Sequence, residues 1–296
     1  MEPILKNIPS PILFQGDATT AYRDPAVIYN GGVFYMFFTL VKTFDTGGVY
    51  LYTAESKSRD LVHWSAPVLL TPGDQRKNFS SPGNVVFHDG KWVLCLQTYC
   101  RENGEKYGNE RCRLYTMESA DLEHWSAPAL LRVKGDVPEE QMGRMIDPYL
   151  VQEPGTGRWF CFYKQNGISY SVSEDLQNWA FCGNIHAGEN PCILRRGENY
   201  FMFHSPENGI GILESGDLLH WKDTGTILYL GQQDWEWAKG RITAGMVLDC
   251  TGVEGIGKYI MFFHGSGPED EQTMFDNYAS IGICWSDDLF HWEWPQ

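Results

Sequence analysis

The sequence is short of positive charge, and this shortage excludes several classes of partner. Its 296 residues contain 23 Lys and Arg against 38 Asp and Glu, a formal net charge of −15. Nucleic acids and anionic membrane surfaces both select clustered Lys and Arg, so neither is expected to bind this chain. No long apolar run is present, and the opening has no basic segment followed by an apolar core. We therefore expect a cytoplasmic protein. The charge balance does not exclude neutral molecules as ligands.

Closely spaced cysteine pairs are also absent. The eight cysteines lie inside strand-like apolar runs, and none belongs to a Cys-x-x-Cys pair. Zinc sites and the disulfide frameworks of small secreted domains are usually recognised by such spacings. Buried core thiols are therefore favoured over a metal site or a disulfide framework.

No helix-length amphipathic segment interrupts the chain, so residues 1–296 are expected to form one domain.

Aromatic residues are plentiful, at 14% of the chain, and many belong to a repeat. The pattern Asp-Leu-x-x-Trp occurs at residues 60–64, 121–125, 175–179, 217–221 and 288–292. An apolar strand precedes each copy, and a strand, a turn and an aromatic strand lie further upstream. Radial repetition of such four-stranded units is the pattern of a propeller. The sequence predicts an all-β fold, a five-bladed β-propeller of four-stranded antiparallel blades.

The repeated motif is interpreted as structural, because an element present in every blade cannot mark one site. Its Leu and Trp are expected to pack between blades, while its Asp closes the turn. Functional residues should instead differ between blades, at the starts of the innermost strands, which converge on the central channel. Alignment on proline places there Asp24, Ser81, Asp147 and Asn190, with Glu189 one residue earlier and Ala244-Gly245 in blade five. Three carboxylates, Asp24, Asp147 and Glu189, are thus predicted to share one pocket.

Three segments that open blades one, three and four carry a resemblance to a known family. They read RDPAVIYNGGVFYMFFT, MIDPYLVQEPGTGRWFCFYK and GENPCILRRGENYFMFHS. With these Asp-Pro, Asp-Pro and Glu-x-Pro starts, the chain resembles glycoside hydrolase family 43 or a close relative among the five-bladed propeller glycosidases. The resemblance implies that Asp24 is the general base and Glu189 the general acid. It also implies that Asp147 tunes and orients that acid.

These residue types suit glycosidic cleavage on chemical grounds as well. The reaction needs a protonated carboxylic acid beside the leaving oxygen and an ionised carboxylate across the sugar ring. Crowding three acids in an apolar channel raises at least one pKa through desolvation and repulsion, which keeps that acid protonated near neutral pH. Glu207 is the rival acid in blade four, although it follows the second strand and is expected in an outer loop. The expected partner is a small oligosaccharide substrate.

Other residues are candidates for binding that substrate. Ser81 lies in the predicted ring, and Arg23 and Arg241 either bond sugar hydroxyls or neutralise the acid cluster. Phe79 and Trp235 come from the segments least like the repeat, where an exposed aromatic ring could stack on a sugar face.

The sequence departs from the family pattern at two blade starts. Many family 43 members open blade five with a Gly-His-Gly-like segment whose His helps hold a calcium or a water cluster on the axis. Here the segment is TAGMV, so no cofactor is expected to be required, and the axial calcium that the resemblance leaves open has no evident ligand set. The blade-two segment NFSSPGNVV is loosely similar to invertase-like propellers, but those open with Asn-Asp-Pro-Asn, which YRDPAV does not match.

The favoured function is an inverting, exo-acting glycosidase of short oligosaccharides, of the arabinofuranosidase or xylosidase kind. Two alternatives stay open: a retaining fructosidase-like propeller glycosidase, and a sugar-binding propeller that has lost catalysis. Turnover of any glycoside would exclude the binding module, and the anomer of the product would separate the two kinds of enzyme.

Overall fold

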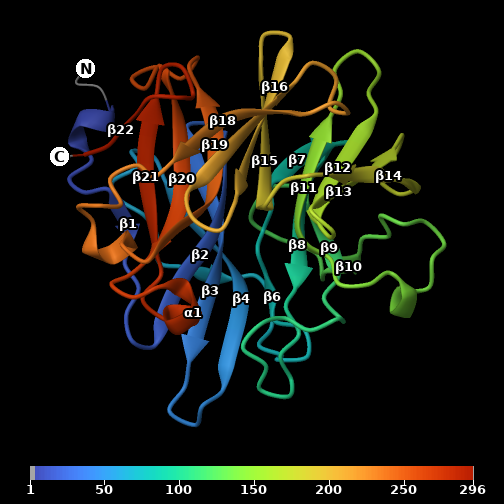
Figure 1. Cartoon of the computed structure of the whole chain (residues 1–296), viewed down its shortest axis with the longest axis horizontal. Helices are drawn as coiled ribbons and strands as arrows, with labels where there is room; N and C mark the ends of the chain where they lie inside the picture. The colour runs from blue at the N-terminus through green and yellow to red at the C-terminus, as the bar shows by residue number, and fades with distance from the viewer. Residues whose placement is uncertain (1–3, 296) are drawn as a thin grey trace.

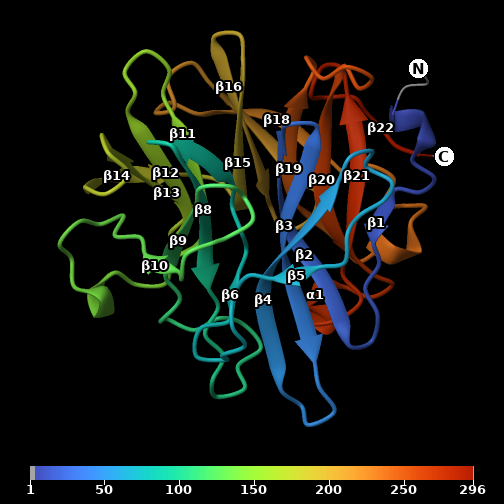
Figure 2. The same cartoon turned by 180° about the vertical axis from the view of Figure 1, so that it is seen from behind.

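The computed structural model describes residues 4–295 and shows five antiparallel β-sheets. Figures 1 and 2 show from opposite sides that the sheets surround a common axis. The innermost strands contact one another around the ring in the order β2, β7, β11, β15, β19 and back to β2. The predicted five-bladed propeller of four-stranded antiparallel blades is therefore confirmed.

Blades one to four are each built from consecutive strands. Blade one contains β2 (Thr20–Asn30), β3 (Val33–Thr43), β4 (Val49–Ser58) and β5 (Val68–Leu69). Blade two has an inner strand split into β6 (Phe79–Ser80) and β7 (Val85–His88), then β8 (Lys91–Thr98), β9 (Leu114–Ser119) and β10 (Ala129–Leu130). Blade three contains β11 (Ile146–Gln152), β12 (Trp159–Lys164), β13 (Ile168–Ser173) and β14 (Trp179–Ile185). Blade four contains β15 (Glu189–Arg196), β16 (Asn199–Ser205), β17 (Ile210–Ser215) and β18 (Lys222–Leu228).

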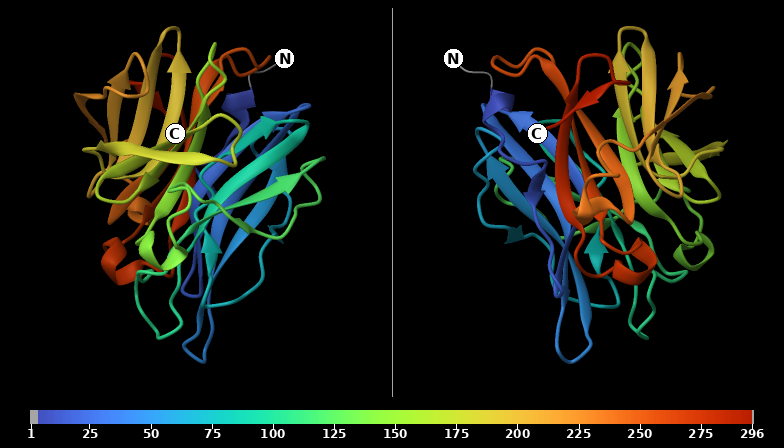
Figure 3. Two further views of the ribbon diagram at one scale, coloured as in Figure 1. Left: turned by 90° about the vertical axis from the view of Figure 1, so that its right-hand side faces the viewer. Right: turned by 60° about the vertical axis from the view of Figure 1, so that its left-hand side comes forward.

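Blade five closes the ring with segments from both ends of the described chain. Its inner strands are β19 (Arg241–Cys250), β20 (Lys258–Ser266) and β21 (Ser280–Ser286). The outer edge of β21 pairs with β1 (Ile12–Phe14) at one end and with β22 (Trp292–Glu293) at the other. The right panel of Figure 3 shows the blue first strands directly beside the red strands of this blade.

Helical structure among residues 4–295 is limited to four short segments. These are η1 (Ile4–Asn7), η2 (Glu139–Gln141), η3 (Glu236–Ala238) and α1 (Glu271–Met274). None of these described helices has the length and apolar character needed to cross a bilayer. The segment α1 lies in the connection between β20 and β21, which forms one wall of an axial pocket.

Aromatic side chains fill the space between neighbouring blades. The Trp of the repeated motif packs edge-on against a fully buried Phe of the preceding blade, with ring centroids 5.4 to 6.3 Å apart. The pairs are Phe37 with Trp125, Phe162 with Trp221, and Phe203 with Trp292. Each edge-to-face pair adds about 0.5–1.5 kcal/mol to the gain from apolar burial. The predicted packing of this Trp between blades is confirmed at these three positions.

The Asp-Leu-x-x-Trp motif also forms the same turn in every blade. In blade four, Asp217 Oδ1 accepts hydrogen bonds from the backbone N–H groups of Leu219 at 2.9 Å and His220 at 2.8 Å. The motif Leu is left-handed in all five copies, with φ between 60° and 78°. This conformation is unfavourable for a non-glycine residue, so the aspartate must hold the turn from within.

The eight cysteines are free thiols, and seven of them are buried. The predicted location in the core is therefore confirmed for these seven. It is wrong for Cys182, because this residue lies on the outer strand β14, whose side chains largely face solvent.

Candidate active site

Each inner strand carries the same backbone irregularity where it reaches the axis. One residue per blade is left-handed, with φ of 49°, 44°, 53°, 50° and 52° at Asp24, Ser81, Asp147, Asn190 and Ala244. The strand register shifts there in four blades, and in blade two the inner strand is broken there. A left-handed non-glycine residue costs roughly 1–2 kcal/mol, and such strain persists only where neighbouring groups hold it.

Hydrogen bonds between blades hold these left-handed residues, which we call the axial ring. In most blades the backbone N–H of the ring residue donates to a side chain on the second strand of the preceding blade. Ser81 N donates to Thr39 Oγ1 at 2.7 Å. Asp147 N donates to Gln97 Oε1 at 2.5 Å. The side chain of the neighbouring blade, and not that of the ring residue itself, therefore fixes the backbone.

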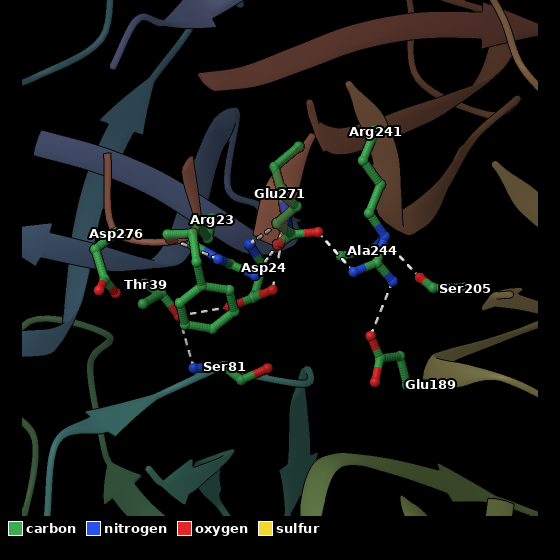
Figure 4. Close-up of polar contacts among 12 residues, drawn as sticks. Arg23, Asp24, Thr39, Ser81, Glu189, Ser205, Arg241, Ala244, Glu271 and Asp276 are labelled. Atoms are coloured by element: carbon green, nitrogen blue, oxygen red, sulfur yellow. Dashed lines mark hydrogen bonds and ion pairs between the residues drawn. The ribbon is translucent and has the colours of Figure 1, made fainter. Parts of the chain in front are cut away.

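The same arrangement closes the ring across blade five. Ala244 N donates to Ser205 Oγ of blade four at 2.8 Å. Asp24 N donates to His264 Nδ1 of blade five at 3.1 Å. Figure 4 shows the Thr39 and Ser205 contacts of the axial ring. Because an accepting ring nitrogen carries no proton, His264 must hold its proton on Nε2.

Blade four differs from this arrangement, because its ring residue contacts the side chain of Asp147 and so helps to hold that side chain in place. The corresponding second-strand residue is Lys164, whose ammonium group cannot accept a hydrogen bond. Asn190 N instead contacts Asp147 Oδ2 at 3.4 Å. Ser81 Oγ donates to the other oxygen of Asp147 at 2.8 Å. Asp147 is thus held from two sides, next to the strand start that carries Glu189.

Four of the five axial-ring residues, all except Ala244, line a pocket of about 760 Å³. All three predicted carboxylates, Asp24, Asp147 and Glu189, line this pocket. Its volume lies within the range of small-molecule sites, roughly 300–1,000 Å³. The structure therefore brings together, from blades one, three and four, the acids that the sequence pattern predicts at one opening.

The three carboxyl groups lie in different electrostatic surroundings. Asp147 is only 6% exposed. Burial raises the pKa of Asp147 to about 7, and the nearby charges of Glu189 and Asp24 add to this rise. The crowding predicted from the sequence therefore acts on Asp147, which keeps its proton up to near neutral pH.

Asp24 and Glu189 are more open to the pocket than Asp147. Their side chains are 14% and 33% exposed. Asp24 Oδ2 accepts a hydrogen bond from Thr39 Oγ1 at 2.9 Å. Glu189 Oε1 accepts one from Arg241 Nη2 at 3.0 Å. Glu189 Oε2 has no hydrogen-bond partner among residues 4–295, which leaves it available to a ligand, while Asp24 Oδ1 lies 3.5 Å from His264 Nδ1.

A fourth carboxylate, Glu271 of α1, lies buried behind Asp24 and Glu189. It forms ion pairs with Arg23 and with Arg241, whose Nη1 lies 2.6 Å from Oε2, and His264 Nε2 is 3.5 Å from Oε1. Burial alone would raise the pKa of Glu271, but these partners together lower it well below its ordinary value. Figure 4 shows Glu271 between Arg23 and Arg241, with Arg241 reaching on to Glu189.

The structure separates the predicted substrate-binding residues into two groups. Arg23, Ser81 and Arg241 line the pocket. Both guanidinium groups are engaged by Glu271, which favours the predicted role in neutralising the acid cluster.

Phe79 and Trp235 lie outside the residues that line this pocket. Phe79 is 7% exposed and packs edge-on against Tyr115, with ring centroids 5.1 Å apart, because it belongs to the inner strand β6. Trp235 packs against both Trp237 and Phe263 and lines a separate groove of about 820 Å³. The irregular sequence around these two rings therefore reflects packing within and between blades, so we do not assign them to the sugar.

The expected position of Glu207 needs a correction. The residue lies in a loop after β16 and is exposed, but this loop borders the axial pocket instead of lying away from it. The second strand of blade four ends close to the axis, so the loop that follows it reaches the pocket rim. Glu207 therefore remains the rival to Glu189.

Sequence reasoning missed the residues that two long connections bring to the pocket. Residues 99–113 contribute Tyr99 and Tyr107, and residues 267–279 contribute Glu271 and Phe275. The two connections contact each other through Tyr107 and Phe275, whose ring centroids lie 5.2 Å apart. The sequence does contain a signal for these two connections, because they are long insertions that interrupt the blade repeat between the second and third strands.

The question of an axial metal concerns the ring itself. Within residues 4–295, no cluster of three or more His, Cys, Asp or Glu side chains has an arrangement that could hold a metal ion. His264, which lines the pocket, directs Nδ1 to the backbone of Asp24 and Nε2 to Glu271, so neither nitrogen points to a shared ion.

Solved structures of glycosidases resemble almost the whole chain. The α-L-arabinofuranosidase of Podospora anserina in complex with cellotriose has a TM-score of 0.67 at 12% identity, covering 96% of this chain and 98% of that one. An exo-1,5-α-L-arabinanase from a bovine ruminal metagenomic library has a TM-score of 0.63 at 17% identity, covering 94% and 98%. At these identities the likeness shows the fold.

The family is shown by the sequence itself. The model of the family described as "Glycosyl hydrolases family 32 N-terminal domain" matches residues 24–194, more than half of the chain. This chain belongs to that family. The matched region begins at Asp24 and includes both Asp147 and Glu189.

Curated relatives match about the same share of the chain as the family model. Two proteins named sucrose-6-phosphate hydrolase, from strains of Zymomonas mobilis subsp. mobilis, are 26% identical over 198 residues. The match covers 62% of this chain but spans only 37% of the length of these relatives.

The predicted resemblance, to family 43 or a close relative among the propeller glycosidases, is confirmed at the level of this group. Family 32 is the related propeller family that the sequence matches. Family 43 itself is represented by distant structures, such as a thermostable family-43 glycoside hydrolase with a TM-score of 0.65 at 14% identity, covering 97% of this chain and 95% of that one.

Proposed function

We propose that this chain is a glycoside hydrolase that cleaves the glycosidic bonds of short oligosaccharides. The observation that carries the proposal is the meeting of Asp24, Asp147 and Glu189, from three separate blades, in one pocket. Hydrolysis needs a proton donor at the leaving oxygen and a carboxylate on the other side of the sugar. Glu189 and Asp24, the two carboxyl groups open to the pocket, can meet these two needs, and the buried Asp147 lies beside them.

In this proposal Glu189 donates the proton and Asp24 acts across the sugar ring. A third of the Glu189 side chain is exposed, so it can reach a leaving oxygen, whereas Asp147 is held by Ser81 in the pocket floor. Asp147 then tunes and orients Glu189, because the charges of the two carboxyl groups interact and because Asp147 Oδ2 contacts the backbone N–H of the next residue, Asn190.

The family match favours a fructosidase-like hydrolase that retains the anomeric configuration. The matched region contains all three acids, and the curated relatives are named for hydrolysis of sucrose 6-phosphate. In such a reaction an Asp24 oxygen bonds to the anomeric carbon as the bond to the leaving oxygen breaks, and that oxygen takes the Glu189 proton. Water then hydrolyses the glycosyl ester, with Glu189 acting as the base.

A second candidate is an inverting arabinofuranosidase-like or xylosidase-like enzyme, in which Asp24 activates the attacking water. The structural likeness over the whole chain supports it, because neighbours include an α-L-arabinofuranosidase and a xylan β-1,4-xylosidase. Both candidates use the same pair of residues and differ in the stereochemistry of the product.

Turnover on a matched panel tests the proposal. The panel contains sucrose, sucrose 6-phosphate, short fructo- and arabino-oligosaccharides, and nitrophenyl arabinofuranosides and xylosides. We expect the wild type to hydrolyse at least one of them and Glu189→Ala to lose that activity. The anomer first formed, followed by NMR, assigns retention or inversion. If calorimetry detects binding of a panel sugar but none is turned over, the protein is a sugar-binding propeller and the proposal is wrong.

A further inference from the structure

Glu271 differs from the other pocket acids because its side chain is almost fully enclosed and has no free oxygen. Its side chain is 5% exposed. Oε2 is bound by Arg241 Nη1 at 2.6 Å, while Oε1 faces both Arg23 and His264 Nε2. A carboxylate with this many donors is fixed in place and ionised, so it is unsuited to exchange protons with a substrate.

One branch of these contacts leads to Glu189. The guanidinium of Arg241 is a planar fork, with Nη1 on Glu271 and Nη2 on Glu189 at 3.0 Å. Arg241 Nε has no hydrogen-bond partner within the described residues, and Pro206 O is a distant third contact at 3.4 Å. The orientation of the fork, and with it the position of the Glu189 carboxyl group, therefore depends chiefly on Glu271.

The other branch leads to Asp24. His264 accepts the backbone N–H of Asp24 on Nδ1, so its proton lies on Nε2 and faces Glu271 Oε1. The negative charge of Glu271 favours this tautomer, which is the one that can hold the left-handed backbone of Asp24. Arg23, the residue directly before Asp24, also ends on Glu271.

We infer that Glu271 is a positioning residue that holds Asp24 and Glu189 in their mutual geometry across the pocket. The inference rests on the proposed function, since it assigns those two residues to the reaction. Glu271 itself touches neither the sugar nor the reacting atoms in this scheme. Its carboxylate links two groups that come from blades one and four through residues of blade five.

The test compares Glu271→Gln, which keeps shape but removes charge, with Glu269→Gln, an exposed residue two positions earlier on the same connection. We expect Glu271→Gln to lower kcat on a natural-type oligosaccharide about 10²-fold, with KM changed less than about threefold, because misplacement affects the transition state more than binding. A dinitrophenyl glycoside should lose less, about 10-fold, since its leaving group needs no proton from Glu189. Glu269→Gln should behave as the wild type on both substrates.

Glu271→Asp separates positioning from mere charge neutralisation. The shorter side chain keeps the charge but cannot reach both branches, so kcat should stay at least about 10-fold below that of the wild type. Wild-type kcat in Glu271→Asp, or wild-type kcat on both substrates in Glu271→Gln, would overturn the inference.

If Glu271→Gln does not fold, Arg241→Lys tests the branch to Glu189, because it keeps the charge but loses the fork. A loss on the oligosaccharide alone supports the inference, and equal losses on both substrates contradict it. The proposed function fails separately: it is wrong if Asp24→Ala and Glu189→Ala keep full activity, whatever Glu271 does.

Discussion

Two regions of this propeller occur once in every blade, and both place a non-glycine residue in the left-handed conformation. The first is the outer Asp-Leu-x-x-Trp turn and the second is the axial ring. In the outer turn the aspartate of the motif itself accepts the backbone N–H groups, as Asp217 does, so the same side chain must recur in every copy.

In the axial ring the hydrogen-bond acceptor lies on the neighbouring blade. Thr39 holds Ser81, and Ser205 holds Ala244. The ring residue's own side chain is thereby free to differ, and the five positions carry Asp, Ser, Asp, Asn and Ala. Because the neighbouring blade holds the backbone of the axial ring, the ring side chains are free to act on a ligand. In the outer turn, the aspartate side chains are occupied in holding their own backbone.

The largest expected effect comes from removing two pocket acids, the ring residue Asp24 and Glu189, which directly precedes the ring residue Asn190. Glu189→Ala should lower the rate on an oligosaccharide by about 10²- to 10⁴-fold, because a poor leaving group departs without a proton. A dinitrophenyl glycoside should be largely spared by Glu189→Ala, while Asp24→Ala should damage both substrates. Steady-state rates on the two substrates measure this. Equal losses for Glu189→Ala with the fold intact would move the role of acid to Glu207.

Asp147→Asn should reduce activity and yet stabilise the fold. Because the folded-state pKa of Asp147, about 7, lies above its ordinary value of 3.8, ionisation costs the folded protein stability as pH rises from about 4 to about 7. Removing the charge should therefore raise the free energy of unfolding at pH 8 by roughly 2–4 kcal/mol, with little change at pH 3.

Urea unfolding of Asp147→Asn and the wild type at the two pH values measures this difference. A stability gain of equal size at pH 3 would show that the side chain is strained for reasons unrelated to its charge. Activity should fall by about 10- to 10²-fold, since Asp147 acts through Glu189 and not on the substrate.

The outer turn should respond in the opposite way. Asp217→Ala removes the acceptor of two backbone N–H groups and should lower the free energy of unfolding by about 0.5–2 kcal/mol, as loss of a comparable cap does. The value of kcat should not change, because the turn lies away from the pocket. Urea unfolding together with a single activity assay checks both parts, and an altered kcat would break the comparison between the two regions.

The smallest effect is expected at the ring position with no functional side chain. Ala244→Gly relieves a left-handed alanine, a gain of about 1 kcal/mol that is offset by the loss of one buried methyl group worth about 0.8 kcal/mol. Stability should therefore stay within about 0.5 kcal/mol of the wild type, as measured by thermal unfolding. A large loss would mean that the methyl group of Ala244 is a required part of the ring.

The sequence predicted the repeated parts of this molecule and the ring that departs from them. The five Asp-Leu-x-x-Trp copies reveal the blades because their side chains form the turn directly. Asp24 and Asp147 are recognisable because each precedes a proline at an equivalent strand start. Patterns of this kind are local, and local patterns can be seen in one sequence.

The interrupted repeat marks the connection that carries Glu271, but the roles of Glu271 and His264 could not be predicted, because they come from contacts made across the ring. His264 bonds Asp24, a residue 240 positions away along the chain. Phe79 and Trp235 show the converse: both lie in irregular sequence, yet the fold uses them for packing against Tyr115 and Trp237.

The outer edge of β21 pairs with two very short strands, β1 and β22. These pairings are expected to be the least stable part of blade five, although they lie far from the pocket acids. The pairing rests on a few residues, among them Ile12, Phe14 and Trp292. Short pairings open at lower free energy than long ones, and protons on their amides exchange with water sooner. Blade five, whose outer edge these two pairings complete, supplies Arg241, His264 and the connection that bears Glu271. The lifetime of the assembled pocket should therefore depend on how often β1 and β22 separate from β21.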